Sequence, residues 1–295
     1  MLPTTTRLTR DPFASTVHLP PGAWATVLDA LCARFITIDR AQWVSRIKRG
    51  RVLDEHGKAV ALDTPHRSGL CIHYYREVAE EMPIPAAESI LHVDEHILLA
   101  DKPHFLPVQP AGDFVEQTLL RRLIRRTGNP NLVPLHRIDR LTAGLVLFST
   151  NPASRAAYHG LFRAGQVTKR YLARAPALPA LGFPLLHSSR VAASKPFFRM
   201  GEVVGPPNSA TRIEVVERGA GTWCYALYPA TGRKHQLRVH MAALGAPITN
   251  DPWYPQLRPQ APDDHDHPLQ LLAERLSLQD PLTHQLREFE SRLTL

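Results

Sequence analysis

The sequence predicts an α+β fold in two parts, a small mixed unit followed by a larger unit built mainly on an antiparallel sheet. The length of 295 residues suits two domains. Segments of helical apolar spacing come early, before residue 50. From residue 90 onward, short apolar or alternating runs are bounded by turn residues, a pattern typical of antiparallel strands. A Pro-containing stretch at 80–85 reads as the linker between the two parts.

Residues 1–22 are expected to form an irregular arm, because four prolines break any regular element there. The small unit is expected over residues 23–80. Apolar residues repeat at helical spacing over 28–35, and Asp39 can cap a second helix that Gly50 closes. The second helix ends in more cations than its C-terminus needs, namely Arg46, Lys48, Arg49 and Arg51.

Composition excludes several classes of protein. Hydrophobic residues are 44% and charged residues 21%, so a folded globular chain is expected. Three scattered cysteines suggest neither a disulfide framework nor a cysteine zinc site. The beginning of the chain lacks the apolar core of a signal peptide, and no apolar run approaches a membrane span, so a cytoplasmic protein is expected. The net charge of +8 favours a polyanionic partner, nucleic acid or a membrane surface.

The larger unit is expected over residues 85–295. Two helices are predicted there, one over 117–127 closed by Gly128 and one over 235–244. The first helix should point four arginines outward, at 121, 122, 125 and 126. The strands are expected at 90–93, 96–100, 144–148, 171–173, 211–217 and 223–228.

Familiar nucleotide, hydrolase and metalloprotease motifs are absent from the sequence. The triplet 265–267, His-Asp-His, lies in a polar loop over 255–268 that promises no rigid support for a metal. His235 and His240 are five residues apart and do not share a helix face. We therefore expect no metal site from these residues.

Two clusters have the composition of a chemical site. In the first, "HRIDRLTAGL", Asp139 lies between Arg137 and Arg140, just before a turn and a buried strand. Flanking arginines keep a carboxylate ionised, and a loop at the mouth of a sheet can present it to a ligand. Taken alone, the cluster favours a surface aspartate in a salt bridge, because such pairs are common.

The second cluster, "TGRKHQLRVH", surrounds a glycine turn with basic and amide side chains at the start of the later helix. Arg238 lies off the stripe of Leu237, Met241 and Leu244, and its guanidinium suits a carboxylate or phosphate. Exposed charges are the plain alternative. Cations near a helix N-terminus are mildly unfavourable, however, so an anionic partner is expected.

Together, "HRIDRLTAGLVLFST" and "TGRKHQLRVHMAALGAPITND" resemble the two signature blocks of the RluA-type RNA pseudouridine synthases. "KRYLA" and "ADKPHFLPVQP" are similar to further family segments in the same order. The resemblance covers residues 85–255 and implies a pseudouridine synthase catalytic domain. It also implies isomerisation of uridine in RNA without a cofactor.

By resemblance, Asp139 matches the aspartate that acts on the nucleoside. Tyr171 matches the tyrosine that stacks on the base and is implicated in removing the C5 proton. Arg238 matches the arginine that pairs with the aspartate. The remaining matches are expected to bind RNA: Arg137, Lys169, Arg233 and His235. In the small unit, "RIKRGRVL" resembles an S-four-like RNA-binding domain, so Arg46, Lys48, Arg49 and Arg51 are expected to bind RNA too.

Ala143 and Lys234 replace residues common in the family blocks, and Gln109 stands where histidine is frequent. These departures leave activity expected but the choice of RNA open, with ribosomal large-subunit RNA first and tRNA next. A monomer is the default. A non-catalytic RNA-binding or chaperone protein is the alternative. A glycoside or nucleoside hydrolase is disfavoured because no second carboxylate can be named.

Overall fold

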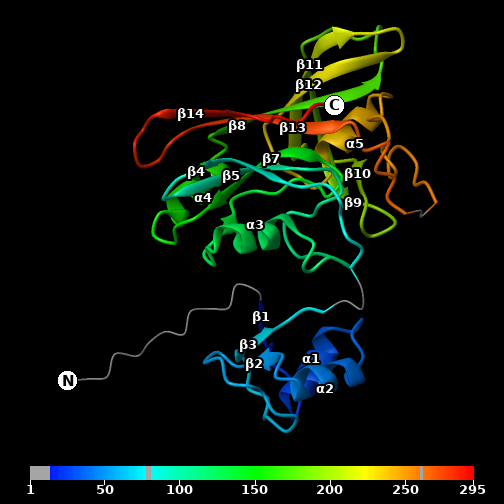
Figure 1. The fold of residues 1–295 in the computed structure, drawn as a ribbon. Helices are drawn as coiled ribbons and strands as arrows, with labels where there is room; N and C mark the ends of the chain where they lie inside the picture. Colours follow the sequence, from blue (N-terminus) through cyan, green and yellow to red (C-terminus); the bar gives the residue numbers. More distant parts are fainter. Residues whose placement is uncertain (1–13, 78–80, 260–261) are drawn as a thin grey trace. The chain divides into compact units, whose positions relative to one another are not determined.

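The computed structural model describes residues 14–77, 81–259 and 262–295, and the chain divides into two compact units, residues 1–80 and 81–295 (Figure 1). The first is a small unit of helices and a three-stranded sheet. The second carries a large, mostly antiparallel sheet with helices. The predicted α+β class is therefore confirmed.

The small unit packs helices α1 (Val27–Arg34) and α2 (Arg40–Lys48) on a sheet of order β1-β3-β2. Its strands are antiparallel: β1 (Ser15–His18), β2 (Val52–Leu53) and β3 (Cys71–Tyr74). Asp39 caps α2 by accepting a hydrogen bond from the Gln42 N–H at 2.7 Å, as the sequence predicts. Trp43 is fully buried at the centre of this core.

The irregular arm expected over residues 1–22 is wrong for Ser15–His18, which form β1. Val17 lies opposite Ile72 of β3, and Leu19 is buried directly after the strand. The two prolines at 20 and 21 follow this strand rather than interrupt it, so they end the pairing without preventing it. Residues 1–13 of the expected arm lie outside the described residues.

The large sheet follows the order β10-β9-β11-β12-β8-β13-β7-β5-β4, with β14 beside β13 and β6 beside β7 (Figure 1). Among the described strands, all the pairs are antiparallel except β7 with β13. The strands are β4 (Ser89–Val93), β5 (Ile97–Lys102), β6 (Val133–Pro134), β7 (Ala143–Ser149), β8 (Val167–Pro176), β9 (Leu185–Ala193), β10 (Met200–Val203), β11 (Ser209–Arg218), β12 (Thr222–Pro229), β13 (Leu271–Gln279) and β14 (Leu286–Glu290).

Helix α3 (Leu119–Thr127) begins at the Thr118 cap and ends at Gly128, which adopts a left-handed φ of 69°. The prediction that its four arginines all face solvent is wrong. Arg121 is buried beside Glu116, and Arg122 donates to the backbone oxygens of Ile84 and Ala86. The helix packs on a preceding segment, residues 84–88, that amphipathic spacing could not reveal.

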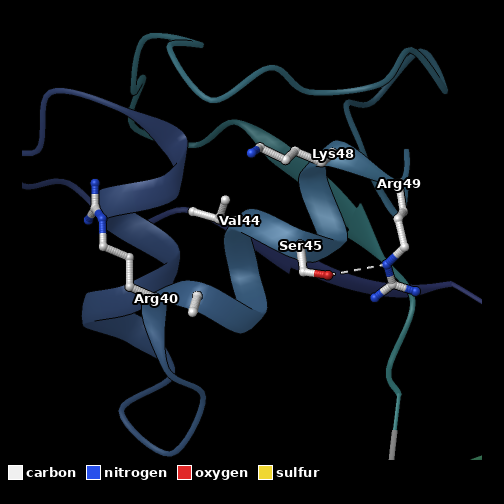
Figure 2. Close-up of a pocket in the computed structure, with 6 residues that line it drawn as sticks. Arg40, Val44, Ser45, Lys48 and Arg49 are labelled. Atoms are coloured by element: carbon white, nitrogen blue, oxygen red, sulfur yellow. Dashed lines mark hydrogen bonds between the residues drawn. The ribbon is translucent and has the colours of Figure 1, made fainter.

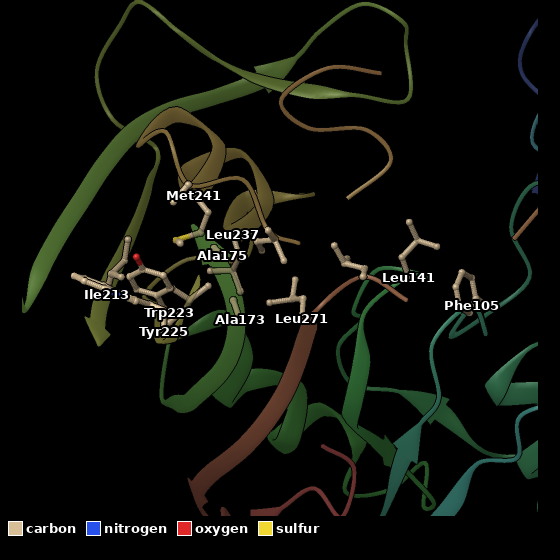
Figure 3. Close-up of a cluster of buried hydrophobic side chains, with 14 residues drawn as sticks. Phe105, Leu141, Ala173, Ala175, Ile213, Trp223, Tyr225, Leu237, Met241 and Leu271 are labelled. Atoms are coloured by element: carbon tan, nitrogen blue, oxygen red, sulfur yellow. The ribbon is translucent and has the colours of Figure 1, made fainter. Parts of the chain in front are cut away.

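Two hydrophobic clusters contain residues from the same face of β8. Side chains alternate along a strand, so residues separated by an even number of positions share a face. Val167 belongs to the cluster that also holds Tyr158 of α4 (Arg155–Arg163). Ala173 and Ala175 belong to the other cluster, which includes Leu237 of α5 (Gln236–Ala243) (Figure 3). Lys169 and Tyr171 have the same parity and therefore lie between the two clusters.

Gly144 lets β7 approach β13 closely. A Cβ at this position would lie 2.2 Å from the Ala273 carbonyl oxygen, and the residue has a φ of +107°. Only glycine meets both requirements without displacing backbone. This contact matters because β7 leaves directly from the loop that carries Asp139. Across the described ranges, no helix is long and apolar enough to cross a membrane.

Candidate active site

Asp139 lies in the loop 135–142 between β6 and β7, and its neighbours are held by buried groups. The Thr142 N–H closes a turn on the Asp139 carbonyl oxygen at 3.1 Å. From β5, the fully buried Lys102 donates from Nζ to the Arg140 carbonyl at 3.0 Å and to the Pro103 carbonyl at 2.9 Å. Burial lowers the pKa of Lys102 well below its ordinary value, although the nearby Asp139 carboxylate opposes that shift.

The same loop is fastened on both sides of Asp139. His104 Nδ1 donates to the Leu141 carbonyl oxygen at 2.6 Å. On the other side, His136 accepts the Leu147 N–H of β7 at 3.1 Å and stacks on Phe162 of α4. Because this loop is fixed at several points, the Asp139 side chain is already oriented and loses little conformational entropy when a ligand binds.

Arg238 of α5 reaches this loop. Its Nη1 lies 3.3 Å from Asp139 Oδ2, while Nε and Nη2 each lie 2.7 Å from an oxygen of Asp251. The Arg238 and Asp251 side chains are 1% and 0% exposed, whereas Asp139 is 26% exposed. Asp251 therefore takes one edge of the guanidinium and turns the remaining N–H groups toward Asp139.

The charge state of Arg238 follows from these contacts. Burial by itself would lower its pKa, but the hydrogen bonds and charge of Asp251, and then the charge of Asp139, raise the pKa above the ordinary value. The guanidinium thus stays cationic inside the protein. Of the two carboxylates that Arg238 contacts, Asp139 is the one that is also exposed to solvent. Such an arrangement holds the Asp139 carboxylate in place and leaves it accessible to solvent.

Tyr171 of β8 is half-buried against the cluster that contains Leu141 and Leu237. Burial, and secondly the Asp139 carboxylate, raise the pKa of the Tyr171 phenol, so it stays protonated. Lys169, two residues earlier on the same strand face, is also half-buried, and burial lowers its pKa. Both residues therefore lie on the strand face between the clusters, where the sequence predicted site residues.

His235, which the resemblance assigns to RNA binding, is buried. Its Nδ1 bonds the Tyr254 hydroxyl at 2.9 Å, and its Nε2 lies 4.0 Å from Asp139 Oδ1. Burial lowers the pKa of His235 to about 4 despite the opposing Asp139 charge, so the ring is neutral at pH 7. Its φ of 56° places the residue at the turn that starts α5. His235 therefore belongs to the inner wall beside Asp139.

The other residues expected to bind RNA divide by exposure. Arg137 and Arg233 are exposed, and Arg233 Nε donates to the Asn208 carbonyl at 3.2 Å. In the small unit, Arg46 is buried beside Trp43, so its placement corrects the expectation of a surface RNA contact. Arg46, Arg49 and Arg51 all lie within ion-pair distance of one carboxylate, that of Glu77.

A hollow of about 780 Å³ lies along α2 of the small unit (Figure 2). In Figure 2 the Arg49 Nε donates to the Ser45 hydroxyl, and Lys48 extends from the same end of the helix. Basic groups thus rim an apolar floor that includes Val44. Its lining is Arg40, Ala41, Val44, Ser45, Lys48 and Arg49.

A sequence model of the family described as RNA pseudouridylate synthase matches residues 96–243, which include Asp139, Tyr171 and Arg238. This chain belongs to that family. It is therefore an isomerase that acts on RNA. An uncharacterized RNA pseudouridine synthase of Synechocystis sp. is 31% identical over 246 residues, which are 77% of this chain and 79% of that protein.

Two further comparisons agree with this membership. The dual-specificity RNA pseudouridine synthase RluA of Escherichia coli strain K12 is 34% identical over 200 residues, covering 65% of this chain and 87% of its own. Human RNA pseudouridylate synthase domain containing 1 shares the fold, with a TM-score of 0.56 at 24% identity. That likeness covers 72% of this chain and 85% of the human chain.

Sequence reasoning missed two buried residues of this candidate site. Asp251 is the last residue of the block "TGRKHQLRVHMAALGAPITND", and Lys102 lies within "ADKPHFLPVQP". The available signal was the charged pair Asp101 and Lys102, which directly follows the apolar run 97–100 at the end of β5. Nothing in the spacing of Asp251 indicates that it folds back on Arg238.

One group within the described residues has the composition of a metal site. His187, Glu202 and His240 offer ligand atoms within 4.8 Å of one another. Both ring nitrogens of His240 are already hydrogen-bonded, Nδ1 to Thr211 and Nε2 to Ser209. His187 likewise contacts Glu202 at 2.7 Å. We assign these groups to the packing of α5 on β9, β10 and β11.

Proposed function

We propose that this pseudouridylate synthase converts specific uridines of structured RNA to pseudouridine with Asp139 as the residue that acts on the nucleoside. The observation that carries the proposal is the position of Asp139. It is the solvent-accessible carboxylate at the end of a buried Arg238–Asp251 pair. An aspartate carboxylate held in this position can attack the sugar or assist detachment of the base, where positive charge develops.

The isomerisation breaks the bond between ribose and N1 of uracil and forms the bond to C5. N1 gains a proton in place of the ribose, and C5 loses its proton in exchange for the ribose. The atoms therefore balance without a cofactor. We assign to Tyr171 stacking on the extruded uracil and a relay role in removal of the C5 proton, in which the hydroxyl takes the C5 proton as it passes its own proton to water and N1 is protonated from water. A neutral aromatic phenol suits the stacking, because it replaces the neighbours that the base loses when it leaves the helix. Arg238 holds the Asp139 carboxylate in position to attack the sugar.

For the substrate, we propose ribosomal large-subunit RNA first and tRNA next. The Escherichia coli relative is described as dual-specificity, which supports considering more than one RNA substrate. The exposed Arg137 and Arg233 and the partly buried Lys169 are assigned to holding the opened strand. The small unit, residues 23–80, is assigned as an S-four-like RNA-binding domain ahead of a catalytic domain over 85–295. We further propose a cytoplasmic monomer.

The decisive experiment compares pseudouridine maps of total RNA from cells with and without this gene. One or a few sites in rRNA or tRNA should vanish, return with the wild-type gene, and stay absent with Asp139→Asn. This outcome would establish the reaction, its substrate and the role of Asp139 together. If no site vanishes, the protein acts as a non-catalytic RNA binder in those cells.

In vitro, Asp139→Asn should abolish conversion of the identified RNA while its Kd stays within about tenfold of wild type, or ~1.4 kcal/mol. The reason is that the substitution keeps the size of the side chain and removes only the charge. Conversion is followed by mass spectrometry of digested RNA, and Kd by fluorescence anisotropy. Turnover by the Asp139→Asn variant near the wild-type rate would refute the assignment of Asp139.

A further inference from the structure

Arg140 follows the proposed nucleophile directly, and its side chain is held by an acidic residue from far along the chain. Nη1 and Nη2 of Arg140 lie 2.6 and 2.9 Å from the two carboxylate oxygens of Asp263. Both side chains are 29% exposed. The guanidinium also lies over two aromatic rings, 5.3 Å from the centroid of Phe114 and 5.9 Å from that of Phe105. The fork of Arg140 is thus fully oriented at the edge of the active site.

The Asp263 carboxylate comes from the polar segment 262–268, which this pair ties to the loop 135–142 that carries Asp139. His265 of the same segment packs edge-on against Phe105 at 4.6 Å. The neighbouring Asp264 has a different role, because it accepts hydrogen bonds from its own loop, from the N–H groups of Asp266 and His267. Asp263 and Asp264 are therefore adjacent carboxylates with separate partners.

The backbone and side chain of Arg140 are held independently. Lys102 fixes the Arg140 carbonyl from inside, so the loop does not depend on Asp263 for its position. The Asp263 carboxylate occupies the guanidinium in the bidentate geometry that a phosphate group would also adopt. In a chain of net charge +8 that acts on RNA, an arginine beside the reacting carboxylate is well placed for a backbone phosphate.

We propose that Arg140 is an RNA-phosphate site next to Asp139 and that Asp263 occupies this site in the free protein. RNA then binds by exchange, in which a phosphate of the nucleotide at or beside the target uridine replaces the Asp263 carboxylate on Arg140. The inference rests on the proposed function, because it takes the substrate to be RNA docked at Asp139. The exchange opposes weak or misplaced polyanions, which must displace a carboxylate before they reach the site.

The test compares Asp263→Asn with Asp264→Asn in the full-length chain, since both remove one negative charge from the same loop. The probe is a fluorescein-labelled RNA hairpin with uridines in its loop, and Kd is measured by anisotropy over a series of salt concentrations. Asp263→Asn should tighten Kd about fivefold more than Asp264→Asn, the upper range for a partly exposed ion pair.

Salt dependence gives a second readout. In the wild type, the released Asp263 carboxylate takes up a cation that offsets the one released from the phosphate. Asp263→Asn should therefore steepen the slope of log Kd against log salt by roughly 0.7, and Asp264→Asn should not. In an Arg140→Gln background, Asp263→Asn should gain no more affinity than Asp264→Asn.

Equal effects of the two substitutions, or weaker binding by Asp263→Asn, would overturn the inference and make the pair a structural tether. Circular dichroism and thermal unfolding confirm that the compared variants are folded. Conversion of uridine by the wild type is measured separately on total RNA. Failure of that conversion would count against the proposed function, whereas the affinity comparison addresses Arg140 and Asp263 alone.

Discussion

Asp251 determines where the Arg238 guanidinium points, although it lies away from solvent and from the proposed substrate. Its Oδ1 accepts from Arg238 and from the N–H groups of Trp253 and Tyr254. The carboxylate is thus fixed by backbone before it fixes the arginine. Trp253 and Tyr254 also place their rings 4.7 and 5.2 Å from the guanidinium carbon. Asp251 is a positioning residue, since it acts on Asp139 only through Arg238.

Asp251→Asn should lower kcat by roughly 100-fold, because a misplaced support near the reacting groups costs about that much. It should also lower the free energy of unfolding by about 3 kcal/mol, since it leaves a buried cation with one distant partner. Single-turnover kinetics and urea unfolding measure the two effects. Asp264→Asn, an exposed carboxylate of the same chain, should change neither. Wild-type kcat in the Asp251→Asn variant would show that Arg238 needs no orienting partner.

At this scale, local spacing indicated which residue types could do chemistry but not which of them are buried. Asp139 and Arg238 were predicted to pair, and the structure brings them to 3.3 Å. Arg46 and His235 were predicted to contact RNA, yet both are buried. Burial of a charged or polar group depends on partners distant in sequence, such as Glu77 for Arg46. Amphipathic spacing contains no information on such partners.

At the scale of elements, the parallel contact between β7 and β13 sets the start of the strand that follows the Asp139 loop. Gly144→Ala should prevent this contact, because its Cβ would meet the Ala273 carbonyl at 2.2 Å with φ at +107°. We expect a loss of at least ~3 kcal/mol of stability and loss of conversion.

Gly160→Ala is the matched control. Nothing lies within 4 Å of its Cβ in the middle of α4, so it should stabilise by roughly 0.5–1 kcal/mol. Thermal unfolding of both variants decides, and wild-type stability in the Gly144→Ala variant would exclude a role for this contact.

Elements with their own stop signals were the most predictable from sequence. The predicted helices at 117–127 and 235–244 correspond to α3 and α5, because Gly128 and Gly245 punctuate the sequence after each. β1 was missed, since its pairing partner β3 lies more than fifty residues away and the flanking prolines dominate the local pattern. The same limit applies to sheet order, which is decided by long-range pairing.

At the scale of the whole molecule, stability should fall as the solution becomes acidic. Burial lowers the pKa of His235 and of His240 to about 4, against roughly 6.5 in an unfolded chain. Between these values the unfolded state binds more protons, so the free energy of unfolding decreases as pH falls from 6.5 to 4. By pH 5 each histidine should lower the free energy of unfolding by about 2 kcal/mol.

Urea unfolding from pH 7 to 5 measures the dependence of this free energy on pH. His240→Gln should make the slope of this dependence shallower. A slope unaffected by His240→Gln would show that this ring is not buried in its neutral form.

The two units should contribute separately to RNA affinity, because the whole chain has a surplus of cations and the small unit carries a basic rim along α2. Deleting residues 1–80 should weaken binding of the labelled RNA and flatten the dependence of log Kd on log salt by roughly 0.7 for each phosphate that the small unit neutralises. Lys48→Gln in the full chain should flatten the slope by the share of one phosphate, because its side chain lies at the rim of the hollow in Figure 2.

Conversion by the shortened protein at saturating RNA distinguishes a binding role from a catalytic one. For a binding role, kcat should persist while KM rises. An unchanged salt slope after the deletion would mean that the small unit does not bind RNA, and the affinity would then reside in the larger unit around Asp139.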